Sequence, residues 1–334
     1  MKIRYFSGEL WEESYVRAKL PNEDIFFHAG PLATFKDLSD ADTEVLCTFI
    51  ESRIGADELK RFPGLKLIAT RSTGFDHIDL KAAAARGVVV ANVPYYGEHT
   101  VAEFAFALLL ALSRRVIDAD ERVRETGTFS HDNLRGFDLA GKTIGIVGCG
   151  HIGIHAIRMA NGFGMNVLGF DVRRDDELAR THAFSYAELP ELLAASDIVS
   201  LHVPYNKHTH HLINRENVDF LKKGAYLINT SRGAVVETQA LIDALQNGTL
   251  AGAGLDVLEE EGTLSDETAL LTAPHPNKEG LKLALENHYL IRHPRVIVTP
   301  HTAFNTTEAV ERILDATVDN IRKFEAGSPT NIVS

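Results

Sequence analysis

A glycine-rich turn near the middle of the chain constrains the fold more than any other feature. The stretch GIVGCGHIG occupies residues 145–153 of a chain of 334. The apolar run TIGIV before it is typical of a buried strand, and a helix is predicted to begin near His151. A second apolar run, NVLGF, ends just before Asp171, at about the 20-residue spacing that nucleotide-binding turns show. Strand, glycine turn, helix and strand in this order predict a parallel, doubly wound sheet.

The residues of this turn suit a pyrophosphate. Gly148 allows a tight turn, Gly150 lets the backbone approach a ligand, and Gly153 permits close contact between helix and strand. The backbone amides at the start of the helix, from His151 and Ile152 onward, attract negative charge. The turn therefore predicts a dinucleotide cofactor.

The residue at the end of the second strand indicates which dinucleotide. Asp171 can accept hydrogen bonds from the adenosine ribose and would repel a 2′-phosphate, which favours NAD. Arg173 and Arg174 follow closely, and an arginine in this place can pair with the phosphate of NADP. The sequence predicts NAD and leaves open how strictly the protein prefers NAD to NADP.

Strand-like and helix-like segments alternate on both sides of a long apolar helix predicted from Thr100 to Glu125. This pattern predicts an α/β chain with two doubly wound, parallel-sheet (Rossmann-like) domains, which also suits the length of the chain. Residues 262–292 are expected to form an irregular surface excursion. Strands are predicted at 3–6, 24–29, 44–50, 65–72, 88–93, 142–148, 166–171, 197–203, 225–231, 252–257 and 295–300, and further helices at 56–62, 79–87, 237–248 and 306–326.

Composition excludes several classes of partner. The chain has 46 acidic and 34 basic side chains, a net charge of −12, which argues against a protein that binds nucleic acid or an anionic membrane. Cys47 and Cys149, the two cysteines, suit a reducing compartment. The charged N-terminus does not read as a signal peptide, and the apolar run VAEFAFALLLALS is too short to span a bilayer. A cytoplasmic protein is expected.

Three polar residues follow strands where an open sheet binds its ligands. Arg232 follows LINTS, Glu261 lies shortly after GLDV, and His301 follows VIVTP. A guanidinium can bind a carboxylate through two parallel hydrogen bonds, and a histidine oriented by a carboxylate can exchange a proton near neutral pH. Beside a nicotinamide, this set suits hydride transfer between the cofactor and a 2-oxo or 2-hydroxy acid. The histidines of KHTHH, by contrast, predict no metal site, because adjacent histidines cannot easily face one ion.

The chain resembles the D-isomer-specific 2-hydroxyacid dehydrogenases from about residue 65 to 305. The similar segments are RSTGFDHIDL, NVPYYGEHTVAE, GKTIGIVGCGHIG, LHVPYNKHT, LINTSRGAVVE, GLDVLEEE and TPHTAF. The resemblance implies that Arg232 binds the substrate carboxylate and that His301, paired with Glu261, is the acid in reduction and the base in oxidation. It also implies substrate contacts by Thr73, Gly74, Tyr96, Phe304 and Phe49, and NAD contacts by Gly148, Gly150, His151, Ile152, Gly153, Asp171, Val203, Pro204, Thr209, Thr230, Ser231 and Asp256.

The same resemblance divides the chain and suggests a substrate. Residues 1–98 with 300–334 would form the substrate domain, and residues 99–299 the inserted NAD-binding domain. The segments SHDNLRGFDLAGKT and HTAFNTTEAV are most similar to the D-lactate dehydrogenase branch, which implies D-lactate and pyruvate, and the family implies a homodimer. A bulkier 2-hydroxy acid, glyoxylate or hydroxypyruvate remains an alternative, as does a non-catalytic NAD(H) sensor like the corepressors of this family.

Overall fold

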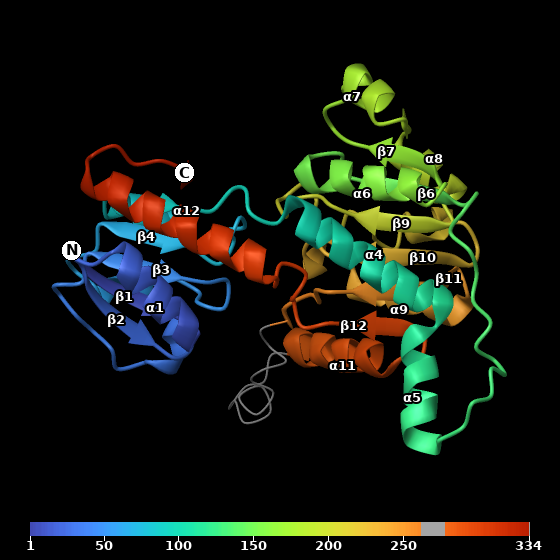
Figure 1. Ribbon diagram of the computed structural model, residues 1–334, viewed down its shortest axis with the longest axis horizontal. Helices are drawn as coiled ribbons and strands as arrows, with labels where there is room; N and C mark the ends of the chain where they lie inside the picture. The colour runs from blue at the N-terminus through green and yellow to red at the C-terminus, as the bar shows by residue number, and fades with distance from the viewer. Residues whose placement is uncertain (262–277, 334) are drawn as a thin grey trace. The chain divides into compact units, whose positions relative to one another are not determined.

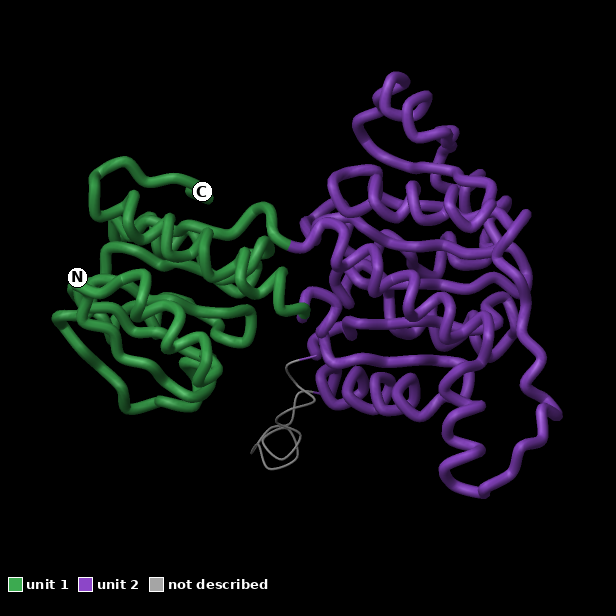
Figure 2. The backbone as a smooth tube through the Cα atoms, viewed as in Figure 1, with its two compact units in different colours: residues 1–96, 306–334 green, residues 97–305 purple. Residues whose placement is uncertain are grey.

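The computed structural model describes residues 1–261 and 278–333 (Figure 1). The chain divides into two compact units, residues 1–96 with 306–334 and residues 97–305 (Figure 2). Each unit contains one sheet with helices packed against it, which confirms the α/β, Rossmann-like class. The roles that the sequence assigns to the two domains stay predictions at this point.

Unit 1 holds a sheet whose strands, in the described residues, follow the order β13-β5-β4-β3-β1-β2. All neighbouring strands are parallel except the edge pair of β13 and β5, an antiparallel contact that the sequence did not predict. The strands are β1 (Lys2–Phe6), β2 (Asp24–His28), β3 (Val45–Thr48), β4 (Leu67–Thr70), β5 (Val89–Ala91) and β13 (Ile332–Val333), and the helices are α1 (Leu10–Lys19), α2 (Ala56–Lys60), α3 (Leu80–Ala85) and α12 (Thr307–Glu325), with a 3-10 turn at Leu32–Thr34.

Unit 2 holds a parallel sheet with the order β12-β11-β10-β9-β6-β7-β8 over the part of the chain that is described. It contains every strand predicted there and one more, β8, which is too short to show a pattern in the sequence. The strands are β6 (Thr143–Val147), β7 (Asn166–Phe170), β8 (Ser185–Tyr186), β9 (Ile198–Leu201), β10 (Ala225–Asn229), β11 (Leu250–Leu255) and β12 (Val296–Val298); the helices are α4 (Glu98–Arg114), α5 (Val116–Thr126), α6 (His151–Gly162), α7 (Asp176–Thr181), α8 (Leu189–Ala195), α9 (Thr238–Asn247) and α11 (Lys278–Arg292), with 3-10 turns at Val218–Phe220 and Gly233–Val235.

Helices cover both faces of this sheet. Helices α4 and α6 lie side by side on one face (Figure 1), where Leu109 and Ile157 belong to one apolar cluster. Leu192 of α8 and Leu241 of α9 belong to a second cluster, which also includes Leu290 of α11. Burial of these side chains is the main favourable term in folding, and it fixes the strand ends at which the site residues lie.

The predicted helix from Thr100 to Glu125 is wrong in one respect, because the structure has two helices there. Arg115 adopts a left-handed conformation with φ 51° and separates α4 from α5. Its guanidinium donates to Asp118 Oδ2 at 2.7 Å and to the carbonyl of Asn133 at 2.8 Å, contacts that hold the turn. A single left-handed residue inside two helical patterns leaves no trace in hydrophobic periodicity.

The prediction that residues 262–292 form an irregular segment is also wrong for the second half of this range. Residues 262–277 lie outside the described residues, but Lys278–Arg292 form the helix α11. Its buried positions are Gly280, Ala284, Asn287 and Leu290. Their spacing is helical, but a glycine and an asparagine occupy half of the stripe, so the apolar signal is weak.

The helix predicted at 79–87 is confirmed as α3. Asp79 caps α3 by accepting a hydrogen bond from the Ala82 amide at 3.0 Å, and Gly87 takes a left-handed conformation just beyond the helix. None of the helices in the described part of the chain combines the length and the apolarity needed to cross a lipid bilayer.

Candidate active site

The sheet of unit 2 brings three loops to one edge. Strands β10, β11 and β12 are parallel neighbours, so their carboxyl ends lie together. Arg232 follows β10, Asp256 follows β11 at once, and His301 follows β12. The open edge of a parallel sheet is where such folds bind ligands, so the predicted chemical residues of this unit share the expected place.

His301 and Glu261 form a direct pair. His301 Nδ1 lies 2.5 Å from Glu261 Oε1, and the other carboxylate oxygen accepts a hydrogen bond from the Leu258 amide at 3.3 Å. An ionised carboxylate can only accept, so Nδ1 carries the proton of this bond and Nε2 is the nitrogen left for proton exchange. His301 has φ 50°, a left-handed conformation that is uncommon for residues other than glycine.

Asp256 holds the loop that carries His301. Its carboxylate accepts hydrogen bonds from Thr299 Oγ1 at 2.6 Å and from the amides of Thr302 and Ala303 at 2.9 and 2.8 Å. Its backbone carbonyl accepts from the His301 amide at 2.8 Å. Burial raises the pKa of Asp256, against the opposing effect of these hydrogen bonds. The sequence predicted Asp256 only as an NAD contact, and its anchoring of residues 299–303 was missed.

Arg232 lies on a turn that packs closely on residues 259–261, three consecutive glutamates after β11 that we call the acidic turn. Its guanidinium Nη1 donates to the carbonyl of Ser231 at 2.9 Å, and the Asn229 side chain donates to the carbonyl of Arg232 at 3.0 Å. A Cβ added to Gly233 would lie 2.0 Å from the carbonyl carbon of Leu258. Only glycine permits this approach, so the Arg232 turn and the turn that leads to Glu261 form one packed unit.

The glycine turn has the form that a pyrophosphate requires. Gly148 has φ +96°, and a Cβ on Gly153 would lie 1.9 Å from the Gly148 carbonyl oxygen. At Gly150, by contrast, an added Cβ would meet nothing within 4 Å. Gly148 is thus required by the turn and Gly153 by the packing. Gly150 leaves open space in front of the first turn of α6, which begins at His151. These residues fit a dinucleotide.

Asp171, the predicted ribose contact, is held in place by two backbone hydrogen bonds. Asp171 Oδ2 accepts from the Cys149 amide at 2.8 Å, and Oδ1 accepts from the Arg173 amide at 2.9 Å. The Arg174 guanidinium instead pairs with Glu188 at 2.6 Å. The carboxylate is therefore held against the glycine turn, where the prediction from the sequence requires it in order to disfavour a 2′-phosphate.

Cys149, an unusual residue in such a turn, has a packing role. Its Sγ would lie only 2.7 Å from a Cβ on Gly169, so the thiol occupies space that this glycine leaves. Burial, together with the charge of Asp171, raises the pKa of the Cys149 thiol to about 12. The thiol is therefore protonated at neutral pH and is not a nucleophile.

The remaining predicted NAD contacts lie on loops after β9 and β10. Thr209 Oγ1 donates to the carbonyl of Pro204 at 2.6 Å and accepts from the Asn206 amide at 2.8 Å, which closes the loop that begins at Val203. Thr230 Oγ1 is buried and has no hydrogen-bond partner among the described residues. Of the histidines that follow Lys207, His210 contacts the ring of Tyr205 and His211 pairs with Glu259. No cluster of three or more metal-ligating side chains is found in the described ranges.

The predicted substrate contacts lie in both units. In unit 1, Thr73 Oγ1 donates to the Val93 carbonyl at 2.8 Å, and Asn92 Nδ2 donates to the Thr73 carbonyl at 2.8 Å, so the turn before Gly74 is held in place. The Arg71 guanidinium lies 5.5 Å from the ring centre of Phe49. Tyr96 also lies in unit 1, and its backbone carbonyl accepts a hydrogen bond from the Arg312 guanidinium. Phe304 is half-buried and lies in unit 2.

His202, which follows β9, gives a testable link between burial and acid stability. Burial lowers the pKa of its ring to about 4, and Nε2 lies 2.9 Å from Ser200 Oγ. The folded state therefore keeps the ring neutral, whereas the unfolded chain protonates it below about pH 6.5. The free energy of unfolding is therefore unaffected by this ring above pH 6.5 and falls as the pH drops toward 4. At pH 5 the loss is about 2 kcal/mol.

We expect His202→Gln to reduce this acid sensitivity. Urea unfolding of both proteins at pH 7 and pH 5 measures it, and the fall in unfolding free energy between the two pH values should be smaller in the variant. Equal falls in the two proteins would show that His202 does not titrate in this way.

Comparison with known proteins decides the family. The profile of the D-isomer specific 2-hydroxyacid dehydrogenase NAD binding domain matches residues 106–303. The chain belongs to this family. A glyoxylate reductase of Korarchaeum cryptofilum is 38% identical over 297 residues, which cover 88% of this chain and 83% of the relative. The family assignment confirms the predicted NAD-dependent oxidoreductase that acts on 2-hydroxy acids.

Solved structures of this dehydrogenase family are similar along the whole chain. A pyruvate reductase of Chlamydomonas reinhardtii has a TM-score of 0.86 and 36% identity, covering 98% of this chain and 97% of its own. A D-lactate dehydrogenase of Aquifex aeolicus, in complex with NAD and lactic acid, has a TM-score of 0.85 and 34% identity, covering 98% and 96%. NAD as the cofactor of this dehydrogenase is thereby confirmed.

Proposed function

We propose that this dehydrogenase interconverts pyruvate and D-lactate, with His301 and Glu261 as the acid–base pair and Arg232 as the carboxylate ligand. The observation that carries the proposal is the 2.5 Å contact of His301 Nδ1 with Glu261 Oε1 at the carboxyl edge of the sheet. NAD supplies the hydride donor or acceptor when it is bound. The chain itself must bind the acid, orient its C2 and move one proton.

His301 moves that proton through Nε2. In reduction, the imidazolium donates a proton to the keto oxygen as C2 gains its hydrogen, and in oxidation the neutral ring takes the proton of the 2-hydroxyl group. Glu261 orients the ring and stabilises its positive charge, since the carboxylate accepts from Nδ1. Asp256 fixes the backbone of this loop, which limits the movement of the ring.

Arg232 binds the carboxylate of the substrate in this proposal. The guanidinium is suited to a two-point contact with the carboxylate of a 2-oxo acid and can polarise the keto oxygen. The resemblance to the family assigns further substrate contacts to the backbone of Thr73 and Gly74 and to Tyr96, Phe49 and Phe304.

Glyoxylate is the second candidate substrate. It differs from pyruvate in lacking the methyl group, and a relative named a glyoxylate reductase is 38% identical to this chain. The similarity to a pyruvate reductase and to a D-lactate dehydrogenase over almost the full length of the chain supports pyruvate instead.

We also propose a homodimer whose contact includes α4 and α5. None of the residues of α5 is buried, although Val116, Ile117 and Val123 are apolar, and Phe129 just beyond the helix is 89% exposed. Exposed apolar side chains grouped in this way are typical of an interface. A molar mass in solution near twice that of the 36.7 kDa chain would support the dimer. The cytoplasmic location that composition suggests stays a prediction.

A substrate panel tests the proposed function. Pyruvate, glyoxylate, hydroxypyruvate, phenylpyruvate and 2-oxoisocaproate are each supplied with NADH and with NADPH, and the loss of reduced cofactor is followed. Pyruvate with NADH should give the highest kcat/KM and yield D-lactate. A higher kcat/KM with glyoxylate or a bulkier acid would replace pyruvate as the proposed substrate. Binding of NADH without turnover of any acid would favour the sensor alternative.

A further inference from the structure

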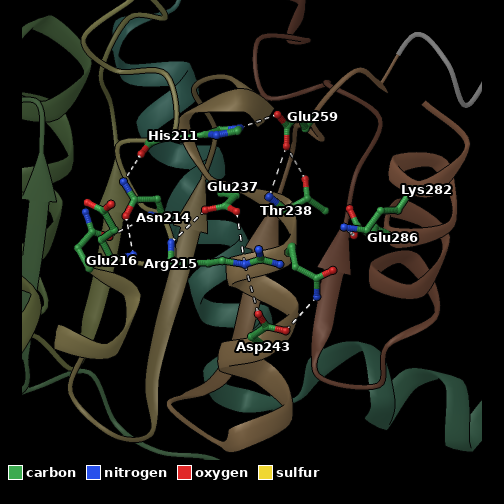
Figure 3. Close-up of polar contacts among 12 residues, drawn as sticks. His211, Asn214, Arg215, Glu216, Glu237, Thr238, Asp243, Glu259, Lys282 and Glu286 are labelled. Carbon is green, nitrogen blue, oxygen red and sulfur yellow. Dashed lines mark hydrogen bonds and ion pairs between the residues drawn. The ribbon is translucent and has the colours of Figure 1, made fainter. Parts of the chain in front are cut away.

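A second histidine–carboxylate pair shares the acidic turn with the acid–base pair. His211 Nε2 lies 2.7 Å from Glu259 Oε1 (Figure 3). Glu259 belongs to the same turn as Glu261. The Glu259 side chain is only 14% exposed, compared with 40% for Glu261. A carboxylate that is largely withdrawn from water requires partners that compensate for its lost hydration.

Glu259 has such partners on two further elements. Its Oε2 accepts from Thr238 Oγ1 at 2.8 Å and, at 3.4 Å, from the Thr238 amide at the start of α9 (Figure 3). The carbonyl of Glu259 accepts from the side-chain amide of the fully buried Asn287 at 2.9 Å, on α11. The acidic turn is therefore anchored to α9, α11 and the loop of His211.

His211 is itself fixed to the Arg232 turn. Its amide donates to the carbonyl of Ala234 at 2.8 Å, two residues beyond Arg232, and its ring stacks on His210 with 3.9 Å between ring centres. The close approach of Gly233 to Leu258 joins the same turn to the acidic turn from the other side. His211 thus links the loop after β9, the Arg232 turn and the turn that carries Glu261.

The geometry points to His211 and Glu259 as positioning residues for the acid–base pair. The acidic turn needs such anchors, because Glu260 has a left-handed φ of 48° and the bond from the Leu258 amide to the Glu261 carboxylate is long, at 3.3 Å. The His211–Glu259 bond holds this turn so that Glu261 meets His301. The inference rests on the proposed function of His301 and Glu261 and assigns no chemical step to His211.

Breaking the bond should lower turnover without weakening cofactor binding. We expect His211→Leu and Glu259→Gln each to reduce kcat for pyruvate by about 10- to 100-fold, the cost of a small misplacement of reacting groups. The KM for pyruvate and for NADH should change less than about twofold. The solvent deuterium isotope effect on kcat should rise, because proton transfer becomes slower than the other steps.

Two further variants separate positioning from a general structural role. His211→Gln can still donate an N–H to Glu259, so it should recover most of the activity. The double variant His211→Leu/Glu259→Gln should lose no more than the worse single variant, because both changes remove one interaction.

Arg215→Gln is the matched control. Arg215 pairs with Glu237 at 3.5 Å and with Asp243 at 3.7 Å, near the same pair (Figure 3), but no contact joins it to the acidic turn among the described residues. Its kcat should stay within about twofold of the unaltered protein.

The results distinguish the inference from the function on which it rests. An unchanged kcat in His211→Leu and Glu259→Gln, or a loss confined to the KM for NADH, overturns the inference, provided that His301→Gln is impaired in the same assay. A fully active His301→Gln overturns the proposed acid–base pair and the inference together. If His211→Leu does not fold, the nearly isosteric Glu259→Gln decides the matter with the same readouts.

Discussion

Replacing His301 with glutamine is expected to lower kcat for pyruvate by about 10²- to 10⁴-fold, the usual contribution of a general acid or base. The glutamine amide can still donate a hydrogen bond to the keto oxygen, but it cannot give up a proton. Substrate binding should be nearly unaffected, because Arg232, the proposed ligand of the substrate carboxylate, is unchanged in this variant. The loss of NADH absorbance under saturating substrate measures kcat, and quenching of protein fluorescence measures the affinity for NADH.

Glu261→Gln is the control for this variant. It keeps an acceptor for Nδ1 of His301 but removes the negative charge that stabilises the imidazolium, so it should be less damaging than His301→Gln. Glu261→Gln preserves the shape of a side chain that is 40% exposed, so this variant should unfold at nearly the same denaturant concentration as the unaltered protein. A His301→Gln enzyme with normal turnover would mean that another group carries the proton.

The sequence predicted the strands and the cofactor turn because their causes are local. Buried strands appear as apolar runs, and a glycine with φ +96° at position 148 or one packed on a carbonyl at position 153 cannot be another residue without strain. The break at Arg115 was not predictable, because the bonds to Asp118 and Asn133 that hold it depend on the fold around it.

The candidate site was predictable in part for the same reason. Arg232 and His301 were found because they follow strands, and strand ends meet at one edge of a sheet. Within the run at 259–261, however, three consecutive glutamates have the same chemistry, and their order alone does not assign partners. The resemblance to the dehydrogenases selects Glu261, and the structure places it on His301 while Glu259 turns to His211. Partner choice is a tertiary property, so the second pair had no signal in the sequence.

Replacing Arg232 with alanine should lower kcat/KM for pyruvate by about 10²- to 10⁴-fold. The change removes two charge-assisted hydrogen bonds to the carboxylate, each worth about 1.5–3 kcal/mol. Because this carboxylate is bound in the ground state as well as in the transition state, the KM for pyruvate should rise steeply, in contrast to His301→Gln. The KM for NADH should not change, since the proposed cofactor contacts are made by the glycine turn and Asp171.

Two comparisons make the Arg232 result specific. Arg232→Lys restores the charge but not the planar pair of donors, so it should recover only part of the loss, and free guanidinium in the assay should partly restore Arg232→Ala. Acetaldehyde, which lacks the carboxylate, should be reduced as poorly by Arg232→Ala as by the unaltered enzyme, so that the preference for pyruvate over acetaldehyde collapses in the variant. If that preference survives intact, the carboxylate is bound elsewhere, and the turn after β10 serves only to pack Gly233 against Leu258.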